Sequence, residues 1–148
     1  MSSRTITAED LGITVERKER PLFQWFLASY LLGKRIQQHV ARQTWEIFIK
    51  EGIDTPQRIA GQSVQQVVDI FGRGDYRRHD ESTAHHLLDM ARTLVREHHG
   101  NLLNMYDECG DDKEFKKRLQ TLKGVGPMTT DIFMREAQPG LIQVDDRR

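Results

Sequence analysis

Residues 122–130 read Leu-Lys-Gly-Val-Gly-Pro-Met-Thr-Thr, and these residue types in this order could bind phosphate. Gly124 can end a helix in a left-handed conformation, and Pro127 suits the first position of the helix that follows. Gly126 has no side chain to keep a ligand away from the backbone. The stretch, called the hairpin below, is therefore predicted to join two helices tightly, with Val125 filling the gap between them. Exposed N–H groups beside a helix N-terminus would bind a phosphate without reading base sequence.

The hairpin resembles the helix-hairpin-helix motif of the endonuclease III superfamily of DNA glycosylases, in which a Gly/Pro-rich loop and an aspartate follow. Residues 138–146 read Gln-Pro-Gly-Leu-Ile-Gln-Val-Asp-Asp and would supply both the loop and the aspartate. The similarity runs from about Pro21 to Arg148. It is closest to the short, single-domain members, whose Tyr-x-Arg-x-Asp-Glu-x-Thr run is similar to Tyr76–Thr83. The resemblance implies a base-excision-repair glycosylase that binds damaged duplex DNA. The residues expected to contact DNA in the hairpin are Lys123, Gly124, Val125, Gly126, Met128 and Thr129.

The resemblance also implies a catalytic carboxylate. In the superfamily, an aspartate after the hairpin stabilises the positive charge that develops on the deoxyribose as the N-glycosidic bond breaks, and it can activate water. This role falls on Asp146, because Asp146-Arg147-Arg148 looks like the Asp-Arg-Arg of the short members. Asp145 is the neighbouring candidate. A polar tail is the alternative interpretation of the pair.

Bifunctional members of the superfamily carry a lysine at the position of Met128, and its amine attacks the sugar. A thioether cannot form that bond, so the resemblance implies a monofunctional glycosylase that leaves an abasic site. Met128 could line the base pocket, but a packing role is the one that we expect. The superfamily also inserts a polar side chain into the DNA from a loop between two helices. That role would fall on Arg35 or Gln37, and a plain surface loop is the alternative.

No metal or iron–sulfur cofactor is expected. Longer members hold an iron–sulfur cluster on four cysteines, whereas this chain has one cysteine, Cys109, which also excludes an internal disulfide. The family hairpin often holds a monovalent cation, for which Leu122, Val125 and their neighbours are candidates. Adjacent side chains on a helix point about 100° apart. The two histidines within each of the pairs His85-His86 and His98-His99 therefore cannot bind one metal ion together. A reducing cytoplasm, with association to the nucleoid, is the expected compartment.

Helical periodicity predicts the elements that position these residues. Residues 21–32 are apolar nearly all round and should form the central helix, with Pro21 at its first position and Gly33 ending it. Local capping signals start further helices at Thr55-Pro56 and at Ser63. Residues 1–20 should form a loose or peripherally packed arm, and residues 21–148 one domain. We therefore expect an all-α fold: a compact bundle of about six to eight helices with a C-terminal helix-hairpin-helix motif.

The composition and charge of the chain are compatible with a DNA-binding helical domain and also with other functions. The 148 residues are 37% hydrophobic and 30% charged, and no apolar run reaches the ~18–20 residues of a membrane span, so we expect a soluble monomer without membrane partners. Twenty-two basic residues balance twenty-two acidic ones. Between residues 113 and 135, however, six basic side chains face two acidic ones, and Arg73, Arg77 and Arg78 form a second basic group. The alternatives are a non-catalytic helix-hairpin-helix DNA-binding module and a helical protein-interaction domain.

Overall fold

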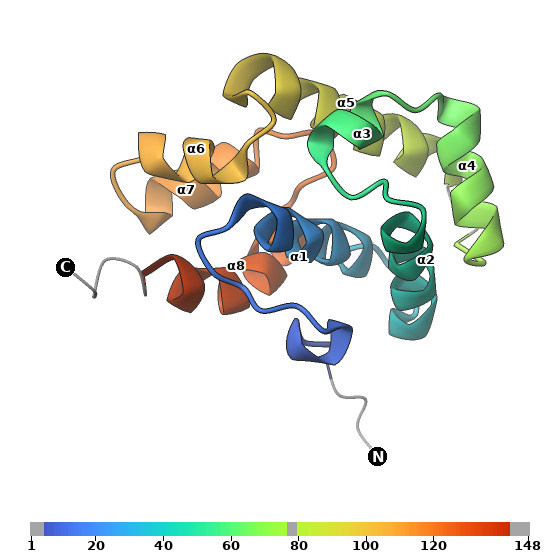
Figure 1. The fold of residues 1–148 in the computed structure, drawn as a ribbon, viewed down its shortest axis with the longest axis horizontal. Coiled ribbons are helices and arrows are strands. Elements are labelled where there is room, and N and C mark those ends of the chain that lie inside the picture. Colours follow the sequence, from blue (N-terminus) through green and yellow to red (C-terminus); the bar gives the residue numbers. More distant parts are fainter. Residues whose placement is uncertain (1–4, 77–79, 143–148) are drawn as a thin grey trace.

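The computed structural model describes residues 5–76 and 80–142, and this part of the chain is all-helical, as predicted. Helix α1 lies in the middle, with α8 alongside it (Figure 1). Helices α2 and α4 lie on one side of this pair and α6 and α7 on the other, while α3 and α5 pack on each other along a third side. The elements are η1 (Glu9–Leu11), α1 (Glu19–Leu32), α2 (Gln38–Lys50), α3 (Pro56–Ala60), α4 (Val64–Arg73), α5 (Asp80–His98), α6 (Leu102–Glu108), α7 (Asp112–Leu119) and α8 (Pro127–Ile142).

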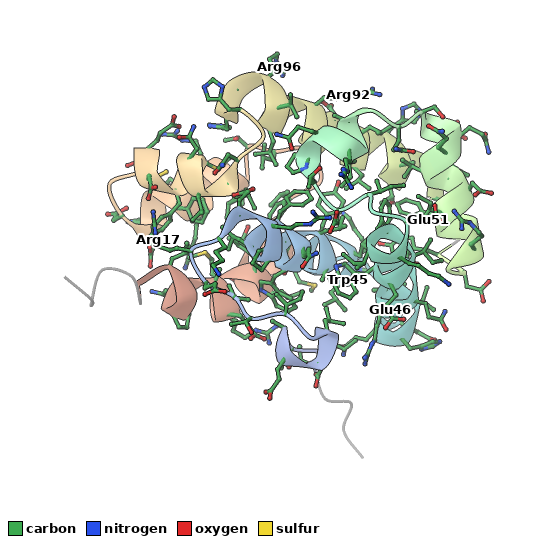
Figure 2. All side chains as sticks on the ribbon, in the orientation of Figure 1. Arg17, Trp45, Glu46, Glu51, Arg92 and Arg96 are labelled. Atoms are coloured by element: carbon green, nitrogen blue, oxygen red, sulfur yellow. The ribbon has the colours of Figure 1, made fainter. Side chains whose placement is uncertain are left out.

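Helix α1 is the core of the bundle. Nine of its fourteen residues are buried, and it packs against α2, α6 and α8. Phe26 meets Phe133 of α8 edge to face, with ring centroids 5.1 Å apart. The indole of Trp45 lies between α2 and α1 and donates to the Gln24 carbonyl at 2.9 Å (Figure 2). A helix that is apolar all round can exist only where neighbours cover every side, and this is the position that α1 occupies.

The local capping signals are confirmed. The Thr55 hydroxyl accepts from the Arg58 N–H, and Pro56 is the first residue of α3. Ser63 and Gln66 form a complete capping box at the start of α4. Helix α1 differs from expectation, because it begins at Glu19 and Pro21 is its third residue. A proline is tolerated there since the first-turn N–H groups have no intrahelical acceptor.

The predicted Gly/Pro-rich loop after the hairpin is wrong over residues 138–142, because α8 continues through Pro139 to Ile142. The reason is packing. Phe133, Ala137 and Leu141 are spaced four residues apart and are all fully buried, so one continuous helical stripe faces the core. Gly140 fits only as glycine, since a Cβ on it would lie 2.4 Å from the Val15 carbonyl oxygen.

The N-terminal arm, described from residue 5, packs along the bundle. The Ile6 N–H donates to the Gln38 side chain at 2.7 Å, and the Ala8 N–H donates to the Glu136 carboxylate at 2.9 Å. Further on, Arg17 reaches Asp107 of α6 at 2.8 Å (Figure 2). The arm thus joins α2, α8 and α6 along the outside of the central pair.

Candidate nucleic-acid interface

The hairpin has the predicted geometry. Helix α7 ends at Leu119 and α8 begins at Pro127, and the turn between them contains Gly124 with φ +80°. Val125 is only 6% exposed and fills the space between the two helices. Its N–H donates to the Leu122 carbonyl at 3.1 Å, which closes the turn. An L residue would be strained at the backbone conformation of Gly124, so the glycine is a requirement of the turn.

The second glycine of the turn faces open space. A Cβ on Gly126 would meet no atom within 4 Å. The first N–H groups of α8, including that of Met128, have no acceptor inside the helix. The Gly126 carbonyl is committed, since both the N–H and the hydroxyl of Thr130 donate to it at 3.1 and 2.9 Å. This corner of the molecule therefore presents backbone donors and the positive end of the α8 dipole to an approaching anion.

The loop between α1 and α2 lies directly beside the hairpin. The Lys34 ammonium donates to the Gly124 carbonyl at 2.8 Å, and the Tyr30 hydroxyl donates to the Lys123 carbonyl at 3.1 Å. Gly33 touches α8 so closely that a Cβ on it would lie 2.1 Å from the Thr129 hydroxyl oxygen. Two segments that are about ninety residues apart in sequence thus form one continuous surface.

The surface carries two lysines, with the carboxylate of Asp89 also close to Tyr30 and His86. Lys34 carries its ammonium 4.4 Å from the centroid of the Tyr30 ring, and Lys123 is exposed on the hairpin. Burial lowers the pKa of His86 on α5, and the nearby charges of Lys123 and Lys34 lower it further. Burial also lowers the pKa of Lys34 and raises that of the Tyr30 hydroxyl. Both lysines therefore lie close enough to His86 to disfavour its protonation, which leaves Lys34 and Lys123 as the positive charges at this surface.

The predicted contact residues divide into exposed and buried ones. Lys123, Arg35 and Gln37 are exposed, and the latter two lie in the loop between α1 and α2. Met128 is 59% exposed, so the expectation that it packs in the interior is wrong: at the second position of α8 its side chain points away from the core. Thr129 is 2% exposed and packs against Gly33, so its side chain supports the hairpin from inside. Asp145 and Asp146 lie outside the described residues.

Two arginines of the predicted basic groups are paired with carboxylates and so add less positive charge to the surface than the sequence suggests. Arg118 of α7 is held by Glu114 at 3.0 Å and lies 3.8 Å from Glu108. Arg73 pairs with Glu51 and with Asp69, on the side of the molecule formed by α2 and α4. Its predicted partners Arg77 and Arg78 lie outside the described residues. Lys123 on the hairpin and Lys34 beside it are thus the cations that lie at the turn itself.

One surface hollow lies next to the candidate interface, and another lies on the side of the molecule formed by α2 and α4. One of about 210 Å³ lies between the arm, α1, α2 and α8, with Leu32, Gln38 and Arg135 in its wall. Because Leu32 and Gln38 flank the loop that carries Arg35 and Gln37, this hollow borders the candidate interface. The other, of about 400 Å³, is lined by α4 and by residues of the segments before and after α3, and it includes the Arg73–Glu51 pair.

Lys34 and Tyr30 are the functional candidates that sequence reasoning missed. Tyr30 offered a signal, because a tyrosine in a fully buried helix must find a partner for its hydroxyl. Lys34 offered none, since a lysine after a helix-ending glycine is ordinary on a protein surface. Only the packing of α1 against α8 brings its ammonium to the hairpin.

Comparison with protein-family models, curated proteins and solved structures gives no significant match. Among the described residues, no three or more histidine, cysteine, aspartate or glutamate side chains are arranged to hold a metal ion. In the same part of the chain, no helix combines the length and apolar character needed to cross a membrane.

Proposed function

We propose that this protein binds the backbone of duplex DNA through the hairpin and the adjoining loop, and that it is a monofunctional, glycosylase-like base-excision-repair enzyme. The proposed DNA binding rests on one observation: three features lie together at one corner of the molecule. They are the open space at Gly126, the N–H groups of Met128 and Thr129, which have no acceptor within α8, and the cations Lys34 and Lys123. Phosphate is the ligand that such donors and charges suit.

The proposed glycosylase activity rests on the sequence resemblance. Asp146 is proposed as the carboxylate that stabilises the oxocarbenium-like sugar and activates water. The resemblance aligns Met128 with the position at which bifunctional members carry the strand-cleaving lysine. A thioether cannot form that covalent bond, so the product would be an abasic site in an intact strand. Arg35 and Gln37 are exposed beside the hairpin, where either could enter the space left by an extruded base.

Binding is tested with Gly126→Ala, which places a methyl group in the space that a phosphate would enter. We expect affinity for a labelled duplex, measured by fluorescence anisotropy, to fall at least about tenfold, the equivalent of one lost charged hydrogen bond. Gly72→Ala is the matched control, because a Cβ there also meets nothing within 4 Å, on α4. Wild-type affinity must also fall as salt rises. Salt-independent binding, or equal effects of the two substitutions, would contradict the proposal.

Catalysis is tested with duplexes that carry uracil, oxidised purines, oxidised pyrimidines or alkylated purines, each developed with and without hot alkali. We expect cleavage of one substrate only after alkali, lost in Asp146→Asn and retained in Asp145→Asn. Cleavage without alkali would refute the monofunctional mechanism. Salt-sensitive binding without excision from any lesion would make the protein a non-catalytic DNA-binding module.

A further inference from the structure

Four carbonyl groups of the hairpin already accept hydrogen bonds from donors of the protein itself. The Leu122 carbonyl accepts from the Val125 N–H, and the Gly126 carbonyl accepts twice from Thr130. The Lys123 carbonyl accepts from the Tyr30 hydroxyl, and the Gly124 carbonyl accepts from the Lys34 ammonium. A loop that binds a metal ion through its carbonyls needs several of them to direct a free lone pair at one centre, and each hydrogen bond uses one of the two lone pairs of a carbonyl. Here four carbonyls have protein donors, and one donor is itself a cation.

Lys34 is held in position from several directions. Gly33, immediately before it, is fixed against Thr129 of α8. The aromatic face of Tyr30 lies beneath the ammonium at 4.4 Å, and Tyr30 is itself tied to the neighbouring Lys123 carbonyl. A half-buried lysine with these restraints has lost most of its rotamer freedom before any ligand arrives. Lys34 is therefore pre-organised, unlike Lys123, which is exposed on the hairpin.

We propose that the Lys34 ammonium is the resident cation of the hairpin: it binds the Gly124 carbonyl in place of a metal ion and donates its remaining N–H groups to a backbone phosphate. An ammonium has three donors, so two remain after the contact with Gly124. A metal ion bound at the Gly124 carbonyl would have to lie beside this positive charge and would be repelled by it. The phosphate contact rests on the proposed DNA binding, whereas the exclusion of a metal ion does not.

The first experiment needs no nucleic acid. Urea denaturation of the wild-type protein is compared in KCl, NaCl and tetramethylammonium chloride at equal ionic strength. A metal ion bound only by the native state would stabilise it over the tetramethylammonium sample. We expect the same denaturation midpoint in all three salts. A higher midpoint in potassium or sodium would show that a metal ion occupies the hairpin, and it would overturn the inference.

The second experiment measures duplex affinity in the same three salts by fluorescence anisotropy. We expect wild-type dissociation constants to agree within about twofold, and Lys34→Met to weaken binding at least about tenfold in each salt. Lys50→Met, which removes an exposed charge at the far end of α2, is the control and should change affinity less than about threefold. Denaturation curves verify that Lys34→Met is folded under the binding conditions, and Lys34→Gln provides a second variant if it is not.

The outcomes separate the two proposals. If wild-type protein shows no salt-sensitive DNA binding, the proposed function fails and the phosphate contact of Lys34 fails with it. If wild-type protein binds DNA but Lys34→Met and Lys34→Gln bind equally well, only the inference about Lys34 is refuted. Wild-type affinity that falls more than about fivefold when tetramethylammonium replaces potassium would likewise overturn it.

Discussion

Replacing Gly124 with alanine tests whether the hairpin is held in the way that its contacts indicate. At φ +80° an L residue costs about 1–2 kcal/mol. The new Cβ would also lie 2.1 Å from the Tyr30 hydroxyl oxygen and 2.9 Å from the ring carbon that carries it. The phenol must move, which breaks its hydrogen bond to the Lys123 carbonyl and leaves a buried hydroxyl unsatisfied, for about 1–3 kcal/mol more. We therefore expect Gly124→Ala to lower the free energy of unfolding by about 2–5 kcal/mol.

Urea denaturation followed by circular dichroism measures this loss. Gly126→Ala is the matched control two residues away, with an ordinary φ and open space around its Cβ, and it should change stability by about 1 kcal/mol or less. Tyr30→Phe removes the atom that the new methyl group meets first. In that background Gly124→Ala should cost about 1 kcal/mol less than in the wild type, because one of the two conflicts is gone. A Gly124→Ala protein within about 0.5 kcal/mol of wild type would refute the reasoning. Equal costs in both backgrounds would show that Tyr30 does not hold the turn.

Two further predictions concern the core. Burial raises the pKa of the Tyr30 and Tyr76 hydroxyls, so their contribution to stability is complete below pH 10 and is lost as pH rises above it, where only the unfolded chain ionises. By pH 11 the loss is about 1.4 kcal/mol per tyrosine, and Tyr76→Phe should abolish its share in urea denaturation curves; an unchanged pH dependence would contradict this. Leu141→Ala should cost about 2–5 kcal/mol by the same measurement, because Leu141 is fully buried beyond Pro139. A loss below about 1 kcal/mol would mean that α8 does not extend to it.

Local signals explain which parts of this fold could be predicted from sequence. The capping box at Ser63, the Thr55-Pro56 start of α3 and the left-handed Gly124 each depend on residues within a few positions of one another. Such features are determined by short stretches of sequence, and all three are confirmed. The all-α class followed in the same way from helical periodicity.

Features that depend on packing were beyond the reach of sequence patterns. Pro139 and Gly140 signal a loop locally, but burial of Leu141 and the close approach of Val15 to Gly140 favour a helix. Helix α1 begins early at Glu19, whose carboxylate accepts the N–H groups of Leu102 and Leu103 and so caps α6, more than eighty residues away. The pairing of Lys34 with the hairpin is of the same kind. Each case needs the position of one helix relative to another, which no local pattern contains.

The hairpin and the loop at residues 33–37 are best understood as one unit, because the central helix holds both. Gly33 ends α1 and presses against Thr129, while Tyr30 and Lys34 hold the carbonyls of Lys123 and Gly124. A shift of α1 relative to α8 would therefore move both segments together. A duplex bound to the hairpin would meet the exposed side chains of the loop at a fixed distance, since neither segment can move freely of the other. If the protein extrudes a base, this rigid coupling is what would align the backbone contact with the side chain that enters the gap.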